Sequence, residues 1–385
     1  MPPRVPLGYC TNVHPAETLA EAWTALRLHA PRLRQRLKGP VGIGLYLPWA
    51  VAEPLASRPE SAESFRDFLA SAGLEVFTAN AFPIGGFHAR RVKEAVYRPD
   101  WTTPRRVDFS ILAGSALAAL LPEGATGTVS TLPVGWKGDS LDSVALERAA
   151  ANLLAVAEVF RQVREESGKT LVLCLEPEPM CVLETSEETA AFFERCLLTA
   201  GKALTRHLGV CLDTCHMALA FEEPAAAVRR LAPLGIAKVQ ISSALSVKDP
   251  ARHPEAVDAL KTFAEERYLH QLACRTPAGV QRLQDLDLLD PEAEPWRTAS
   301  EWRCHFHVPV DRESFGPLGT TRDWIEKAIP ELLKLPETPQ FEVETYTWGV
   351  LPEAERPTDA DSLAEGLARE MLWARKALGM KGETA

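Results

Sequence analysis

The segment Gly209-Val210-Cys211-Leu212-Asp213-Thr214-Cys215-His216 begins as a short apolar run, ends that run in a carboxylate and brings an imidazole three residues later. This pattern predicts a buried strand with Asp213 at its end. An ionised Asp in such a place needs a cation or strong hydrogen bonds to compensate it. Because His216 lies just beyond the strand end, the pair suggests two metal ligands. The alternative is an Asp213 that only caps the next helix.

Similar apolar runs recur along the chain and alternate with helical patterns, for example at 16–36, 61–72, 140–166, 186–204 and 254–267. Such alternation is typical of repeated βα units, and eight units in succession predict one closed α/β barrel, a (β/α)8 TIM barrel, rather than a doubly wound sheet. The eight predicted strands are 7–10, 42–47, 74–80, 127–132, 170–175, 209–212, 237–242 and 340–343.

One stretch, 268–310, interrupts this alternation. It holds two β-like pieces, 268–274 and 280–287, a turn rich in Pro and Glu, and then the β-like run 302–308. A connection of roughly 40 residues is long for a compact domain and is usually functional. We therefore expect a single barrel domain over 1–385, with 268–310 inserted between the last two strands as a hairpin-bearing lid.

Composition narrows the function classes. The formal net charge of −10 disfavours a nucleic-acid partner, which needs clustered Lys and Arg. No apolar run approaches the roughly 18 residues of a membrane span, and the N-terminus lacks the pattern of a signal peptide. The eight Cys include no C-x-x-C pair, which fits reduced thiols. We expect a cytoplasmic protein that acts on a small molecule, and a homo-oligomer is compatible with the sequence.

Chemistry in such barrels lies at the carboxyl ends of the strands, where this chain gathers carboxylates and imidazoles. His305 and His307, at i and i+2 of an extended segment, point to one side. Gln240 alternatively makes a hydrogen bond to substrate or to a residue behind the ligands, and one of the two histidines alternatively stacks on substrate. The candidate ligands of a divalent metal centre, with Zn or Mn in one to three ions, are Glu176, Asp213, His216, Gln240, His305, His307 and Glu344.

A second set of side chains lies near predicted strand ends or in the insertion. For each of them the alternative is an ordinary packing or surface role. The candidate substrate contacts are His88, Trp136, Lys137, Glu178, Arg275 and Trp348.

These motifs resemble those of the xylose-isomerase-like metal-dependent TIM barrels, a superfamily of sugar isomerases and epimerases that also contains endonuclease IV. The resemblance rests on Glu176, on the string 213–216 (Asp-Thr-Cys-His), on His305-Phe306-His307 and on Glu344-Thr345. The strings 78–83, 87–88, 92–101, 175–179 and 268–271 are similar to a narrower group, the EboE family, the metabolite traffic proteins of bacterial ebo gene clusters.

The chain departs from the superfamily pattern at two positions. Gln240 stands where a metal-binding His is common, and His305 stands where endonuclease IV has an Asp. The acidic net charge also differs from the basic DNA-binding surface of that enzyme.

The resemblance implies a metal-dependent isomerase or epimerase that handles a sugar, sugar phosphate or cyclitol-like metabolite, with Glu176 and Glu344 as the catalytic proton carriers. Two alternatives stay open. One is an endonuclease-IV-like phosphoester hydrolase, which the additional imidazoles favour and the acidic charge disfavours. The other is a non-catalytic metabolite-binding protein, which suits the EboE family. An amidohydrolase barrel would carry its H-x-H string on the first strand, whereas here it comes late.

Overall fold

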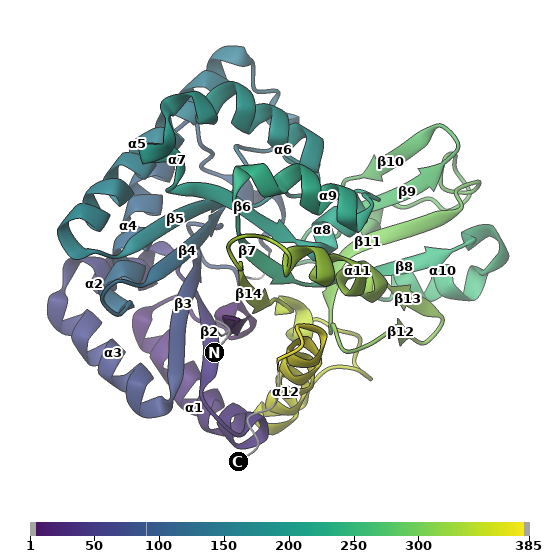
Figure 1. The fold of residues 1–385 in the computed structure, drawn as a ribbon. Coiled ribbons are helices and arrows are strands. Elements are labelled where there is room, and N and C mark those ends of the chain that lie inside the picture. Colours follow the sequence, from purple (N-terminus) through teal and green to yellow (C-terminus); the bar gives the residue numbers. More distant parts are fainter. Residues whose placement is uncertain (1–4, 90, 381–385) are drawn as a thin grey trace.

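The centre of the molecule is a closed barrel of eight parallel strands in the order β1-β14-β7-β6-β5-β4-β3-β2 (Figure 1). The computed structural model describes residues 5–89 and 91–380. The barrel strands are β1 (Leu7–Cys10), β2 (Val41–Tyr46), β3 (Leu74–Asn80), β4 (Thr126–Thr131), β5 (Thr170–Leu175), β6 (Leu208–Asp213), β7 (Ile236–Ile241) and β14 (Gln340–Val343). The predicted barrel is confirmed, and each predicted strand end lies within one residue of the observed one.

The helices pack around the barrel except for α10 (Pro254–Lys261), which lies beside a second sheet formed between β7 and β14 (Figure 1). They are α1 (Leu19–Leu37), α2 (Trp49–Ser57), α3 (Pro59–Ala72), α4 (Pro104–Leu120), α5 (Ser143–Ser167), α6 (Ser186–Phe192), α7 (Lys202–Thr205), α8 (Thr214–Leu219), α9 (Pro224–Leu231), α10 (Pro254–Lys261), α11 (Arg322–Leu332) and α12 (Ala360–Ala377). In the described part of the chain, no helix has the length and hydrophobicity to cross a lipid bilayer.

Local sequence explains where several helices begin and end. Thr18 starts α1 with a capping box, in which its hydroxyl accepts from the Glu21 amide and the Glu21 carboxylate accepts from the Thr18 amide. Gly168, with a φ of 71°, ends α5 in the left-handed conformation that favours glycine. The expected helix 186–204 is shorter, because α6 passes at Phe193 into a π turn and a 3-10 turn that stop before Gly201.

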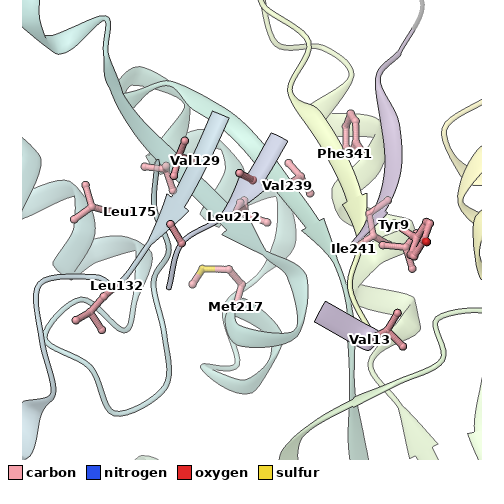
Figure 2. Packing of buried hydrophobic residues seen from close by; sticks show 14 of the residues in the cluster. Tyr9, Val13, Val129, Leu132, Leu175, Leu212, Met217, Val239, Ile241 and Phe341 are labelled. Atoms are coloured by element: carbon pink, nitrogen blue, oxygen red, sulfur yellow. The ribbon is translucent and has the colours of Figure 1, made fainter. Parts of the chain in front are cut away.

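The hydrophobic core consists of buried apolar side chains from the barrel strands and from the helices that pack on them. Val129, Leu212, Val239 and Phe341 come from four barrel strands and are fully buried. Figure 2 shows these side chains together with Met217 from α8, which packs beside the strand ends. Strands that are covered on both sides become continuous apolar runs, which is why the sequence identifies them so clearly.

The barrel interior also contains a buried ion pair. The Lys238 ammonium on β7 lies 2.7 Å from the Glu342 carboxylate on β14, and both side chains are fully buried. Lys238 also donates to the Asn80 side-chain oxygen at 2.8 Å. Burial alone would lower the pKa of Lys238, but the Glu342 carboxylate together with Cys211 and Cys10 raises it above its usual value. Gly44 makes room for Glu342, because a Cβ there would lie 1.5 Å from its Oε1 atom.

Between β7 and β14 the chain forms a second, six-stranded antiparallel sheet in the order β10-β9-β11-β8-β13-β12. Figure 1 shows it in green at one side of the barrel. Its strands are β8 (Ser243–Lys248), β9 (Leu272–Thr276), β10 (Gly279–Leu283), β11 (Glu301–Val308), β12 (Ser314–Phe315) and β13 (Leu318–Thr320). The expected segment 268–310 thus supplies the three strands at one side of a larger sheet, β10, β9 and β11, and its role as a lid stays a prediction.

Candidate metal centre

Three carboxylates meet at the carboxyl end of the barrel. Glu176 follows β5, Asp213 is the last residue of β6, and Glu344 follows β14. All three are buried. One carboxylate oxygen from each lies within 4.8 Å of the corresponding oxygens of the other two. Parallel strands that close a barrel bring their carboxyl ends to one rim, so this convergence follows from the topology.

Asp213 has one satisfied and one unsatisfied oxygen. Its Oδ1 atom accepts hydrogen bonds from the Ser242 hydroxyl at 2.7 Å and from the His216 amide at 2.9 Å, so Asp213 does cap α8. Its Oδ2 atom is buried and has no hydrogen-bond partner. Leaving a buried carboxylate oxygen unpaired is costly, and a cation at that point removes the cost.

Three histidines face one another beside these carboxylates. The Nε2 atom of His305 lies 3.1 Å from that of His216 and 3.2 Å from that of His307. The Nδ1 atoms of His216 and His307 lie 2.9 and 3.0 Å from the backbone oxygens of Pro177 and Glu344. A carbonyl oxygen only accepts, so these Nδ1 atoms carry a proton, and the Nε2 atom of each ring faces its neighbours.

Gln271 fixes the third ring in the same way. Its Oε1 atom lies 2.7 Å from Nδ1 of His305, while its amide group donates to the Tyr97 hydroxyl at 2.9 Å and to the Pro179 carbonyl at 3.4 Å. Because the amide nitrogen already has acceptors, the oxygen must face His305 and accept the Nδ1 proton. The three Nε2 atoms thus face one another at hydrogen-bond distance, an arrangement suited to the coordination of a cation.

The electrostatic environment agrees with this picture. Burial, with the neighbouring histidines, lowers the pKa of His305 well below its usual range, and burial lowers that of His307 to about 4. Burial raises the pKa of Glu176 to about 8, and Asp213 adds to that effect. Burial also raises the pKa of Glu344. Neutral imidazoles with carboxylate oxygens form a donor set typical of Zn or Mn, so the residues present fit a divalent metal ion.

The donors form overlapping groups. Asp213, His216 and His307 make one group of ligand atoms within 4.8 Å of one another, and Glu178, His216 and His305 make another. Glu178, expected to contact substrate, therefore lies among the candidate ligands, with its Oε2 atom 3.2 Å from Nε2 of His216. Cys215 forms a further group with His305 and His307. The set offers more donors than a single tetrahedral ion uses.

Gln240 lies in the pocket beside these donors. Its amide nitrogen donates to the Asn80 side-chain oxygen at 2.9 Å, and its amide oxygen faces the Cys211 thiol at 3.4 Å. These contacts suit the alternative interpretation of Gln240 as a hydrogen-bonding residue of the pocket floor, and its role as a ligand stays a prediction.

Two of the expected substrate contacts are held close to the pocket without lining it. His88 uses Nε2 to contact the backbone oxygen of Asn12 at 2.7 Å. The Trp136 ring stacks on Tyr97, with ring centroids 4.6 Å apart. Asn12 and Tyr97 line the pocket, whereas His88 and Trp136 do not. Both therefore support pocket residues in this structure.

The other three expected contacts have partners elsewhere. Lys137 forms ion pairs with two glutamates, of which Glu184 lies at 2.8 Å. Arg275 lies over the Phe221 ring at 4.6 Å. Trp348 donates from its indole nitrogen to Glu370 at 3.0 Å. These three side chains have their contacts elsewhere and do not line the pocket.

The structure also adds residues that the sequence interpretation did not select. Asn12 donates to Oε1 of Glu344 at 2.8 Å, and Asn80 joins the Lys238–Glu342 pair to the pocket floor. In the sequence, Lys238 is the one charged residue in the otherwise mostly apolar run 236–241, and this position could have indicated the buried Lys238–Glu342 ion pair. For the aromatic side chains of the pocket wall the sequence carried no such signal.

No protein-family model and no curated protein sequence matches the chain. Solved structures do match. A xylose isomerase domain protein from Planctomyces limnophilus is 14% identical, with a TM-score of 0.52 over 98% of this chain and 99% of that one. A xylose isomerase-like TIM barrel protein from Mycobacterium smegmatis, in complex with magnesium, is 14% identical, with a TM-score of 0.53 over 97% and 98%. The IolI protein with a bound zinc atom is 11% identical, with a TM-score of 0.52 over 99% and 100%.

At these identities the likeness defines the fold. The chain has the fold of the xylose isomerase-like TIM barrels.

Proposed function

We propose that this protein is a metal-dependent isomerase or epimerase that acts on a small oxygenated metabolite. The observation that carries the proposal is the convergence of the Glu176, Asp213 and Glu344 carboxylates within 4.8 Å of one another at the ends of three barrel strands. Two proteins of the same fold hold magnesium or zinc, which supports a divalent ion here. We assign Zn or Mn, in one to three ions, to the donors Glu176, Asp213, His216, His305, His307 and Glu344.

A bound divalent ion polarises a carbonyl–hydroxyl pair and makes the adjacent C–H more acidic. The protein must then remove and return a proton. Glu176 suits this task, because a carboxylate held at the end of β5 beside the other candidate ligands is positioned to accept a proton and return it. Glu344 is the second carrier, and the hydrogen bond from Asn12 to its Oε1 atom orients it.

Substrates that fit this chemistry are sugars, sugar phosphates and cyclitol-like molecules. The motifs similar to the EboE family support a role in the handling of such a metabolite within an ebo gene cluster. In that setting a protein that binds the metabolite without turning it over is a further outcome of the tests below.

The convergence of three imidazole Nε2 atoms favours a second candidate function. His216, His305 and His307 add nitrogen donors beyond the three carboxylates, and a multi-ion cluster of that kind is suited to phosphoester hydrolysis. A hydrolase depends on the residues that would hold the additional ions, so loss of His216 or His307 should harm it at least as much as loss of Glu176.

Proton exchange distinguishes these functions. Metal-loaded protein is incubated in D2O with cyclitols, ketoses and their phosphates, and deuterium at substrate carbon is measured by mass spectrometry. An isomerase places deuterium on carbon, whereas a phosphoester hydrolase releases phosphate without it. Glu176→Gln should lower exchange about 10²–10⁴-fold, and Glu184→Gln, the same change at a buried Glu outside the pocket, serves as the control. Metal-loaded protein that shows neither reaction with any of these compounds would contradict both enzymatic functions.

A further inference from the structure

The pocket that leads to the candidate metal centre has two chemically distinct parts. Its floor consists of the carboxylates, imidazoles and amides described above, and its walls consist largely of aromatic and aliphatic side chains. The empty space amounts to about 670 Å³, including the open mouth. The aromatic wall residues are Tyr46, Phe82, Phe87, Tyr97, Tyr268 and Tyr346.

Three of these rings form a cluster contributed by three distant segments. Phe87 belongs to the loop after β3, Tyr268 precedes β9 in the inserted region, and Tyr346 follows β14. The ring centroids are 4.8 Å apart for Phe87 and Tyr268, 5.0 Å for Phe87 and Tyr346, and 4.9 Å for Tyr268 and Tyr346. The Tyr346 ring also lies 4.8 Å from the ring of His307. Aromatic surface thus begins directly beside the candidate ligands.

Two tyrosine hydroxyls of the wall are already engaged. The Tyr46 hydroxyl donates to the backbone oxygen of Gly85 at 2.9 Å. The Tyr97 hydroxyl donates to Glu178 at 3.1 Å and accepts from Gln271 at 2.9 Å. With these hydroxyls occupied, the two side chains offer a ligand their ring surfaces more than their polar atoms.

The wall also offers no free positive charge among the residues that the structure describes. Lys93 is the one Lys or Arg in the described lining. Its ammonium lies 2.5 Å from Asp285, 3.5 Å from Asp287 and 3.2 Å from the Glu265 carbonyl. A phosphate group is normally recognised by Arg, Lys or a helix N-terminus. In this pocket the cation that could serve is neutralised by its own partners.

We infer that the substrate of this pocket joins a metal-chelating oxygen head to a planar apolar body and carries no phosphate. This inference rests on the proposed function for the head group and narrows it for the remainder of the molecule. The head meets the floor donors, and the body packs against the cluster of Phe87, Tyr268 and Tyr346. A ring packed against such a cluster gains both burial of apolar surface and aromatic contact.

Three hydroxamates with one chelating head and different bodies test the inference. Benzohydroxamate carries a phenyl ring, acetohydroxamate a methyl group and phosphoglycolohydroxamate a phosphate. Binding to the zinc-loaded protein is measured by calorimetry. Benzohydroxamate should bind about ten- to hundredfold more tightly than acetohydroxamate, as expected for the burial of a ring, and phosphoglycolohydroxamate no more tightly than acetohydroxamate.

Two variants test whether the preference for the phenyl compound depends on the aromatic residues of the pocket wall. Phe87→Ala removes a partly buried loop side chain and should abolish most of the preference for the phenyl body while retaining zinc. Phe68→Ala, a partly buried ring packed on Trp23 and outside the pocket lining, is the matched control and should retain the preference.

Equal binding of the phenyl and methyl compounds, tightest binding of the phosphate compound, or failure of all three on zinc-loaded protein would overturn the inference and leave the metal site intact. A protein that retains no divalent metal would instead overturn the proposed function, and the inference with it.

Discussion

Replacing Asp213 by Asn should separate metal binding from folding. Asparagine has the size of aspartate and keeps an oxygen that accepts from the His216 amide and the Ser242 hydroxyl, at 2.9 and 2.7 Å in the native protein. It also remains a good helix cap. It loses the negative charge and the unpaired oxygen that the metal ion would use. Since the Asp213 charge raises the pKa of Glu176, its removal should leave the metal-free protein equally stable or more stable.

The magnitude follows from linkage. At a free zinc concentration of 100 times the native Kd, bound metal stabilises the native protein by about 2.7 kcal/mol. Loss of a supporting contact alone weakens metal sites by about 10–100-fold, so loss of a charged ligand should weaken binding at least about 100-fold. At the same zinc concentration the variant then gains only about 0.4 kcal/mol. The metal-dependent part of the unfolding free energy should therefore fall by about 2.3 kcal/mol.

Urea unfolding with and without zinc, together with metal analysis of the purified protein, measures both quantities. The matched control is Asp142→Asn, because Asp142 also caps a helix, α5, but does not line the pocket. That variant should keep the native response to zinc. Native metal content in Asp213→Asn, or a loss of stability without metal as large as the loss with it, would refute the assignment of Asp213.

Three further outcomes are expected. Zinc binding at pH 7 should release at least one proton, because burial raises the pKa of Glu176 to about 8 and a carboxylate ligand must be deprotonated. Binding enthalpies measured by calorimetry should therefore vary with the ionisation enthalpy of the buffer, and enthalpies that do not vary would contradict this. Lys238→Met should cost about 3–5 kcal/mol of unfolding free energy by leaving Glu342 unpaired, and the double variant with Glu342→Leu should recover most of it in urea titrations. Burial raises the pKa of Glu370 from 4.5 to about 7. The folded protein thus binds more protons than the unfolded chain between those values, and this contribution to stability falls as pH rises through that window; Glu370→Gln should flatten that part of the stability profile.

The barrel and its carboxylates could be predicted because each depends on a local signal. Several barrel strands, such as β2, β5 and β6, are largely apolar runs, and burial on both faces produces such runs. The others, such as β4 with its Thr and Ser residues, are recognised mainly by their place in the alternation with helices. Once eight strands are placed in a parallel barrel, the positions of Glu176, Asp213 and Glu344 at strand ends fix them to one rim. Their convergence needed no knowledge of side-chain packing.

The six-stranded inserted sheet could not be predicted, because its strand pairing is set by contacts between segments that are distant in the sequence. Strand β8 begins at Ser243, with only Ser242 between it and the end of β7, so its apolar residues resemble a continuation of the barrel strand. The direction and register of pairing come from contacts between distant segments. In β11 the register with β8 shifts between Cys304 and Val308, the stretch that carries both histidines. The ion pair that neutralises Lys93 joins residues 192 positions apart.

The number of bound ions and the charge of the substrate are independent observables, and together they decide between the two candidate functions. The three carboxylates form one group of candidate ligands, whereas the facing Nε2 atoms of His216, His305 and His307 offer donors for an additional ion. Two zinc ions would by themselves favour hydrolysis, and one manganese ion isomerisation. The wall of the pocket, however, offers a phosphate no free cation among its described residues, because Lys93 is paired with Asp285. A phosphoester substrate would have to rely on the ions alone against an aromatic wall, whereas an uncharged substrate with an apolar body uses both parts of the pocket. For this reason isomerisation remains the better-supported function even if two ions bind.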